Sequence, residues 1–159
     1  DKQTTAASEF EILAPVSGEL VNLEKTNDPA FSSRAVGDGV AVVPQEGTVC
    51  APVSGTVAAL FPTEHALGIM SDNSSAQVML HIGIDTVKLE GKGFHALVAQ
   101  GDHVDAGQPL VEVDFDVVRA AGFDPTVFVI VCERSENSTL REHASGPVAV
   151  KEPVVWLSE

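Results

Sequence analysis

Hydrophobic residues along the chain fall mainly in short runs, which alternate with polar residues or are bounded by glycine, proline, asparagine and aspartate. Alternation with period two is typical of strands that bury one face, and the abundant valine favours strands. The pattern predicts an all-β protein in which only residues 28–33 and 115–121 form short helical turns. The expected strands cover residues 12–13, 18–23, 39–43, 48–51, 55–61, 65–70, 77–84, 94–99, 110–114, 127–132, 147–150 and 154–157.

An internal repeat adds information about topology, because residues 14–20 (APVSGEL) recur at 51–57 (APVSGTV). Proline cannot donate to a sheet ladder and glycine allows a positive φ, so each copy predicts a strand entry followed by a sharp corner. Together with a third corner at 101–110 (GDHVDAGQPL), the repeat resembles the corners of biotinyl and lipoyl carriers. We therefore expect an antiparallel β-sandwich of the barrel-sandwich hybrid type.

The clearest alternation covers residues 76–84. It places Met79, His81 and Gly83 on one face, opposite the face formed by Val78, Leu80, Ile82 and Ile84. His81 is therefore expected to point away from the strongest apolar stripe. Because Gly83 lies two residues beyond it and lacks a side chain, we also expect open space over the His81 ring.

The segment Ser71–Ser75 has turn chemistry and predicts a hairpin. If these five residues form the loop, Met70 pairs with Ala76, and His65 lies opposite His81 on the same face, with Cβ atoms about 4.5–5.5 Å apart. A shift of one residue would place the two side chains on opposite faces.

Two facing imidazoles suit three different arrangements, and their spacing alone leaves all three open. The pair could bind a metal, form a nucleophile with a helper, or pack in a crowded face. The other histidines, His95, His103 and His143, lie in polar or turn segments, and we interpret them as surface residues.

The charge narrows the choice of partner. The 159 residues include 9 basic and 23 acidic side chains, a formal charge of −14. Such a chain repels nucleic-acid phosphates and anionic membranes, so we expect no nucleic-acid partner and favour a basic one. No apolar run approaches the roughly 20 residues that span a bilayer.

The cysteines indicate the redox compartment of the protein, and the start of the chain indicates where the domain begins. Cys50 lies between apolar residues and Cys132 ends an apolar run, which predicts buried free thiols in a reducing compartment. Residues 1–9 are polar and without period, and we interpret them as a flexible linker before one domain at 10–159. Because the chain begins at Asp1 rather than at methionine, we expect a piece of a longer polypeptide.

Several motifs resemble a known family. They are GDGVA at 37–41, APVSGTV at 51–57, FPTEHA at 61–66 and LHIGIDTV at 80–87, followed by LEGKGF at 89–94. In this order and spacing, across about residues 10–157, they closely resemble the glucose-family EIIA of the bacterial phosphoenolpyruvate-dependent sugar phosphotransferase system. Leu67 and Met79 depart from the family pattern, which often has phenylalanine there.

The resemblance implies a cytoplasmic phosphoryl carrier, either free-standing or fused to a membrane permease. Phosphorylated HPr would pass its phosphoryl group to His81, and His81 would pass it to a cysteine of an EIIB domain during sugar uptake, with EIIC as the membrane part. By the same resemblance, His65 would stabilise the phosphoryl group and Thr63 would orient the histidines. No cofactor is required, although His65 and His81 could hold Zn²⁺ if a partner carboxylate completed the site.

The resemblance also implies a docking face around the histidines. Asp28 and Asp85 match carboxylates at its rim, where a basic donor would meet them. The matching apolar positions are Phe31, Val36, Phe61, Met79 and Val87.

Three other functions are compatible with this fold class. A biotinyl or lipoyl carrier needs a turn lysine flanked by methionine or by aspartate and alanine, and Lys25, Lys88 and Lys92 lack those neighbours. A zinc peptidase of the lysostaphin type needs a His-x-His pair, which the chain lacks. An EIIA-like regulatory binding module without a transport role remains the main alternative. The sugar is not specified, since sugar specificity belongs to the membrane domain.

Overall fold

The computed structural model describes residues 9–72 and 76–158. Residues 1–8 of the expected linker, and 73–75 of the expected hairpin loop, lie outside the described residues, whereas Glu9 already belongs to the first strand. The described elements are β1 (Glu9–Leu13), β2 (Gly18–Asn22), η1 (Leu23–Lys25), α2 (Pro29–Ser32), β3 (Asp38–Pro44), β4 (Thr48–Cys50), β5 (Gly55–Leu60), β6 (Ala66–Ser71), β7 (Gln77–Ile82), η2 (Thr86–Leu89), β8 (Phe94–Ala96), β9 (His103–Val104), β10 (Pro109–Val113), α3 (Phe115–Ala120), β11 (Val127–Glu133), β12 (Thr139–Glu142), β13 (Gly146–Val148) and β14 (Pro153–Ser158).

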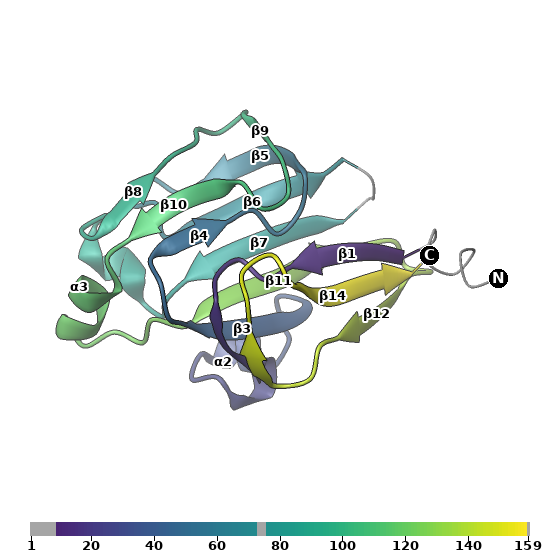
Figure 1. Ribbon diagram of the computed structural model, residues 1–159, viewed down its shortest axis with the longest axis horizontal. Coiled ribbons are helices and arrows are strands. Elements are labelled where there is room, and N and C mark those ends of the chain that lie inside the picture. Colours follow the sequence, from purple (N-terminus) through teal and green to yellow (C-terminus); the bar gives the residue numbers. More distant parts are fainter. Residues whose placement is uncertain (1–8, 73–75, 159) are drawn as a thin grey trace.

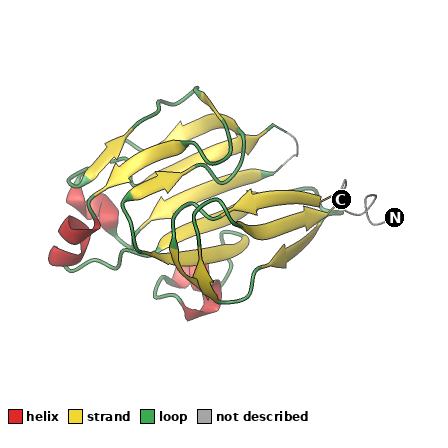
Figure 2. Ribbon diagram, viewed as in Figure 1, coloured by secondary structure: helices red, strands yellow, loops and turns green. Residues whose placement is uncertain are grey.

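The described strands form three antiparallel sheets, which confirms the expected all-β class (Figure 1). The largest has the order β13-β2-β3-β11-β7-β6-β5-β9, and the two smaller ones have the orders β1-β14-β12 and β4-β10-β8. The short helices lie at the periphery of the sheets (Figure 2). Every expected strand is present within a few residues at its ends.

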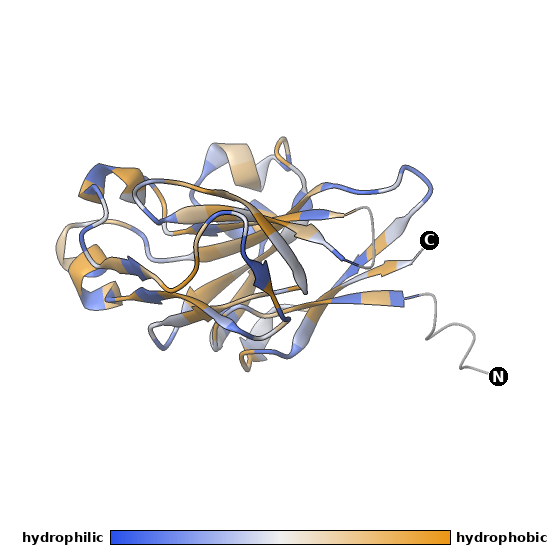
Figure 3. Ribbon diagram, turned by 90° about the horizontal axis from the view of Figure 1, so that it is seen from above, coloured by the Kyte–Doolittle hydropathy of each residue, from blue (hydrophilic) through white to orange (hydrophobic). Residues whose placement is uncertain are grey.

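The core lies between the large sheet and the two small ones. One hydrophobic cluster combines Ile12 and Val155 of one small sheet, Leu110 of the other, and Leu80 and Val129 of the large sheet, all at most 1% exposed. Hydrophobic residues are accordingly concentrated in the strands, and hydrophilic ones gather in the loops (Figure 3). This is the antiparallel sandwich that the repeat and the corners predicted.

A second, smaller cluster covers the opposite face of the large sheet. It contains Ala41, Phe128 and Ile130 from the strands, with Leu23 of η1 and Phe31 of α2 packed over them. The candidate site lies beside this second cluster.

The two copies of the repeat are joined reciprocally. The Leu13 N–H donates to the Pro52 carbonyl at 2.9 Å, and the Cys50 N–H donates to the Pro15 carbonyl at 2.8 Å. In each copy the serine hydroxyl also accepts a backbone N–H, from Val150 at Ser17 and from Ala106 at Ser54. The repeat therefore marks two matching corners that complete each other's hydrogen bonds.

The glycine of each corner has a different role from the one expected. Neither Gly18 nor Gly55 has a positive φ. Each instead begins a strand so close to its neighbour that a Cβ atom would overlap the carbonyl oxygen of Val43 or Met70, respectively. Close approach of two backbones, rather than a left-handed turn, requires glycine at these positions.

Two short strands and the two helical turns η1 and η2 were missed, and one thiol was wrongly expected to be buried. Sequence alternation missed β9, which has two residues, and β12, a short edge strand whose one apolar residue, Leu140, is partly buried against the core. Cys132 is exposed, because a bulge between Val131 and Glu133 turns it out of the ladder. Cys50 is buried and free, as expected.

Candidate functional site

The predicted register between β6 and β7 is wrong by one residue. Ala66, not His65, is the cross-strand partner of His81, and Met70 pairs with Gln77. The Ser71 N–H donates to the Ala76 carbonyl at 3.1 Å, so the ladder continues one rung further than the five-residue loop allowed.

The two imidazoles nevertheless meet. Their ring centroids are 5.2 Å apart and their planes are inclined by 83°. His65 precedes the first residue of β6 and follows Glu64, whose φ of 63° lies in the left-handed region. The His65 carbonyl accepts the Ile82 N–H at 2.7 Å, so its backbone remains bonded to β7 one residue before β6 begins.

The His81 proton is placed by the backbone. Its Nδ1 lies 2.8 Å from the carbonyl oxygen of Gly83. A carbonyl can only accept, so Nδ1 carries the hydrogen and Nε2 has the free lone pair.

Gly83 does not provide open space over the ring, contrary to the expectation. It has a φ of 82°, and a Cβ there would overlap the methyl group of Thr86. The Thr86 hydroxyl, fully buried, donates to the Ile82 carbonyl at 2.5 Å. Glycine is thus required for the tight turn that brings its carbonyl to His81.

His65 is the more enclosed of the two histidines, at 3% exposed. Its Nδ1 lies 2.6 Å from the hydroxyl of Thr63, as the resemblance implied, and the ring of Phe61 meets it edge to face at 5.4 Å. Burial lowers the pKa of His65 to about 4, and the neighbouring His81 adds to the shift.

Burial also lowers the pKa of His81, although the hydrogen bond to Gly83 and the charges of Asp28 and Asp85 oppose that shift. Both imidazoles are consequently neutral at pH 7. A neutral imidazole with a free Nε2 is a nucleophile that needs no prior loss of a proton.

The five apolar residues expected to form a docking face differ in exposure. Phe61 and Val87 are 47% and 50% exposed. Val36 and Met79 are half-buried beside the second cluster. Phe31 is buried. Its ring meets that of His81 edge to face at 5.2 Å and stacks on Phe128 at 4.4 Å. Phe31 therefore connects the His81 ring with the rest of the second cluster.

The two predicted rim carboxylates lie on loops beside His81. Asp28 caps α2 by accepting the Ala30 N–H at 3.0 Å. Asp85 is exposed, has a φ of 64° and precedes η2. Both raise the pKa of His81, so both act electrostatically on the candidate nucleophile.

The histidine pair alone is an incomplete metal site. Two imidazoles supply half of a tetrahedral zinc shell. Across residues 9–72 and 76–158 there is no group of three or more histidine, cysteine, aspartate or glutamate side chains placed to hold a metal ion. Any zinc here would need ligands from another molecule.

The remaining histidines lie outside the pair. His95 and His103 are exposed, as expected, and His103 Nε2 lies 2.6 Å from Asp72 Oδ2. His143 is half-buried because its ring stacks on Trp156 at 6.4 Å.

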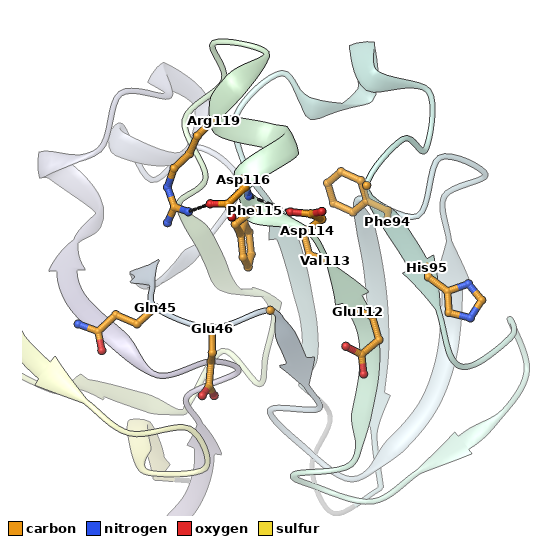
Figure 4. Close-up of a pocket in the computed structure, with 12 residues that line it drawn as sticks. Gln45, Glu46, Phe94, His95, Glu112, Val113, Asp114, Phe115, Asp116 and Arg119 are labelled. Carbon is orange, nitrogen blue, oxygen red and sulfur yellow. Dashed lines mark hydrogen bonds and ion pairs between the residues drawn. The ribbon is translucent and has the colours of Figure 1, made fainter.

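A cavity of about 700 Å³ lies elsewhere, between β8, β10, α3 and the turn at 45–47. Figure 4 shows Phe94 and Phe115 among acidic side chains, with Arg119 directed at Asp116. None of the predicted site residues lines it.

Sequence reasoning missed Asp124, Thr126 and Thr86, which hold the turn after His81. Asp124-Pro125-Thr126 has the residue types of an Asx turn, a local signal that could have been noticed. Nothing in the sequence indicates that this turn contacts residues 83 and 84.

Among the described residues no helix combines the length and hydropathy of a membrane span.

Known proteins resemble this chain in sequence and in structure. Residues 10–137 match the model of the family described as "phosphoenolpyruvate-dependent sugar phosphotransferase system, EIIA 1". The chain is 44% identical over 144 residues to the glucose-specific EIIA component of Bacillus cereus, covering 91% of this chain and 86% of the relative. Among solved structures, glucose permease IIA from Mycoplasma capricolum matches with a TM-score of 0.84 and 35% identity, covering 93% of this chain and 95% of the other.

Longer relatives contain the same domain. The chain is 41% identical to part of the glucose-specific EIICBA component of Streptococcus pneumoniae and 42% identical to part of the beta-glucoside-specific EIIBCA component of Bacillus subtilis. These matches cover 91% and 92% of this chain but 20% and 24% of the relatives, so the chain spans about a fifth to a quarter of their length. With a family match over most of its length and a free-standing relative of similar size, the chain belongs to the glucose-type EIIA family, a phosphotransferase component of the sugar phosphotransferase system.

Proposed function

We propose that this protein carries a phosphoryl group from phosphorylated HPr to a cysteine of an EIIB domain, and that Nε2 of His81 is the atom that carries it. The observation behind this assignment is the 2.8 Å hydrogen bond from His81 Nδ1 to the Gly83 carbonyl. It leaves the Nε2 lone pair free on a ring whose centroid lies 5.2 Å from that of His65, which in turn contacts the exposed Phe61.

His81 accepts and releases the phosphoryl group without gaining or losing a proton. The Nε2 lone pair attacks phosphorus in line, the N–P bond of the donor phosphohistidine breaks, and a new N–P bond forms on His81. Nδ1 keeps its hydrogen throughout. In the next step an EIIB thiolate attacks the same phosphorus, and the N–P bond electrons return to Nε2.

His65 supports the transferred group as a neutral donor. To donate from Nε2–H to a phosphoryl oxygen, it needs Nδ1 as an acceptor, which the Thr63 hydroxyl satisfies by donating across their 2.6 Å contact. Because the pKa of His65 is about 4, this donor is uncharged at neutral pH. Its distance from His81 suits an oxygen of a group on His81 Nε2.

The surroundings suit a partner that is apolar at its centre and basic at its rim. Phe61, Val87 and the half-buried Val36 and Met79 offer the apolar contacts, with Phe31 beneath them. Asp28 and Asp85 place negative charge beside the histidines. HPr and EIIB are the partners we propose for this face. In the longer relatives, EIIB is part of the same chain as EIIC.

Zinc would bind here only in a complex with a partner protein. His65 and His81 would supply two nitrogen ligands, and a carboxylate from a bound partner would have to supply a third. Phosphoryl transfer as proposed here requires no metal.

The test is labelling with phosphorylated HPr. We expect one phosphate per chain, located on His81 by mass spectrometry under conditions that preserve phosphohistidine. H81Q should abolish it and H95Q, at an exposed histidine, should retain it. Labelling retained in H81Q would refute the assignment, and a wild-type chain that binds HPr without accepting phosphate would instead be a regulatory binding module.

A further inference from the structure

The turn that fixes the His81 proton is itself held by a second loop. The N–H groups of Gly83 and Ile84 donate to the carbonyl oxygens of Thr126 and Asp124, at 2.8 and 2.9 Å. The position of the Gly83 carbonyl, which accepts from His81, therefore depends on residues 124–126, directly before β11.

The Asp124 carboxylate orders that loop. Its Oδ1 accepts both the N–H and the hydroxyl of Thr126, at 2.9 and 2.5 Å. Burial favours a higher pKa for Asp124, but the hydrogen bonds from Thr126 and Asn27 outweigh it and lower the pKa, so the group is ionised. An ionised acceptor makes stronger hydrogen bonds than a neutral one.

The same carboxylate reaches the other side of the site. Its Oδ2 accepts from the Asn27 side chain at 3.1 Å. Asn27 directly precedes Asp28 and the helix that carries Phe31, whose ring contacts His81. Asp124 thus joins the turn that receives the His81 hydrogen to the segment that supports the His81 ring.

We propose that Asp124 is a positioning residue for phosphoryl transfer: by holding the Gly83 turn through Thr126, it keeps the His81 hydrogen on Nδ1 and Nε2 free. This inference rests on the proposed role of His81. Asp124 acts through Thr126 and Gly83 and not by touching the phosphoryl group.

The first measurement needs no phosphorylation. Nitrogen NMR of histidine-labelled protein distinguishes the two neutral tautomers of His81. We expect the Nδ1–H form alone in the wild type and a mixture in D124A. The rate at which D124A accepts phosphate from HPr should fall about tenfold, mainly in kcat, as expected when a reacting group is misplaced.

The variant D124N removes the charge of Asp124 but keeps an oxygen that can accept hydrogen bonds. Its amide oxygen can still accept from Thr126, and the Asn27 amide can turn to present its own oxygen to the new NH₂ group. D124N should therefore retain the wild-type tautomer and lose much less of the rate than D124A, although its neutral oxygen accepts more weakly. If D124A does not fold, T126V removes one donor from the same network, and it should give a smaller shift toward the second tautomer.

The matched control is D102A. Asp102 also accepts a backbone N–H three residues away, from Ala99 at 2.9 Å, in a turn that holds neither histidine. It should match the wild type. A folded D124A with the wild-type tautomer and rate would overturn the inference, as would a D124N that behaves like D124A. A wild-type chain that accepts no phosphate would defeat the proposed function instead, and the NMR result would still decide what Asp124 does.

Discussion

His65 and His81 meet edge to face with ring centroids 5.2 Å apart, although the two residues are not cross-strand partners. The contact arises where β6 has not yet begun and the chain leaves a left-handed residue. Substitution of the His65 side chain leaves its backbone bond to Ile82 in place, so the roles of the two histidines can be tested separately.

Substitution of His65 should affect phosphoryl transfer to EIIB more than phosphoryl acceptance from HPr. H65Q keeps the His81 nucleophile but removes the imidazole beside it, so it should still accept phosphate from HPr and pass it to EIIB at least about tenfold more slowly. Single-turnover labelling of EIIB measures the second step. Onward transfer at the wild-type rate would rule out the helper role.

The buried His65 should make stability depend on pH. Its pKa is about 4 in the folded protein and near 6.5 when unfolded, so below pH 6.5 the unfolded chain binds a proton that the folded chain does not. Stability from this residue is complete above pH 6.5 and is lost as the pH falls toward 4.

Urea unfolding of the wild type and H65Q at two pH values measures this effect. Relative to H65Q, the wild type should lose about 2 kcal/mol between pH 7 and pH 5. Parallel pH profiles for the two proteins would contradict the burial argument.

Loss of a rim charge should change the titration of His81. D28N keeps a side chain that can cap α2 but removes a charge that raises the pKa of His81, so that pKa should fall further. Association with HPr should also slow, more at low salt than at high salt. NMR titration and stopped-flow binding measure the two effects. D116N, at a side chain that is 97% exposed beside the other cavity, should change neither.

The corner glycines should tolerate no side chain. In G55A the new methyl group would overlap the Met70 carbonyl, which should cost about 1–3 kcal/mol of unfolding free energy. Gly68, in the neighbouring strand, has no atom within 4 Å of an added Cβ, so G68A should be neutral or slightly stabilising. Urea unfolding of both variants tests the comparison, and equal effects would show that the corner can relax.

The sequence was informative where structure depends on local pattern. Alternation predicted the strand that carries His81, and the repeat predicted two corners, because both signals lie within a few residues. The edge strand β12 has one apolar residue, Leu140, and a single position makes no alternation to find. Cys132 was misjudged because a one-residue bulge reverses the face of a side chain without any change in composition.

The proximity of the candidate site residues was predictable from the sequence, and the strand register was not. His81, His65 and Thr63 were identified through the resemblance and do lie together. The register was wrong because one extra hydrogen bond, between Ser71 and Ala76, decides where the loop begins. The contacts of Asp124 with residues 27 and 84 join parts of the chain far apart in sequence, and such pairs leave no periodic signal.

The reciprocal bonds between Leu13 and Pro52 and between Cys50 and Pro15 have a consequence for how the molecule opens. Neither corner can detach without breaking a bond that the other corner needs, so the two should protect their amide hydrogens to the same extent during exchange with solvent. We therefore expect the two corners to open together, as one unit.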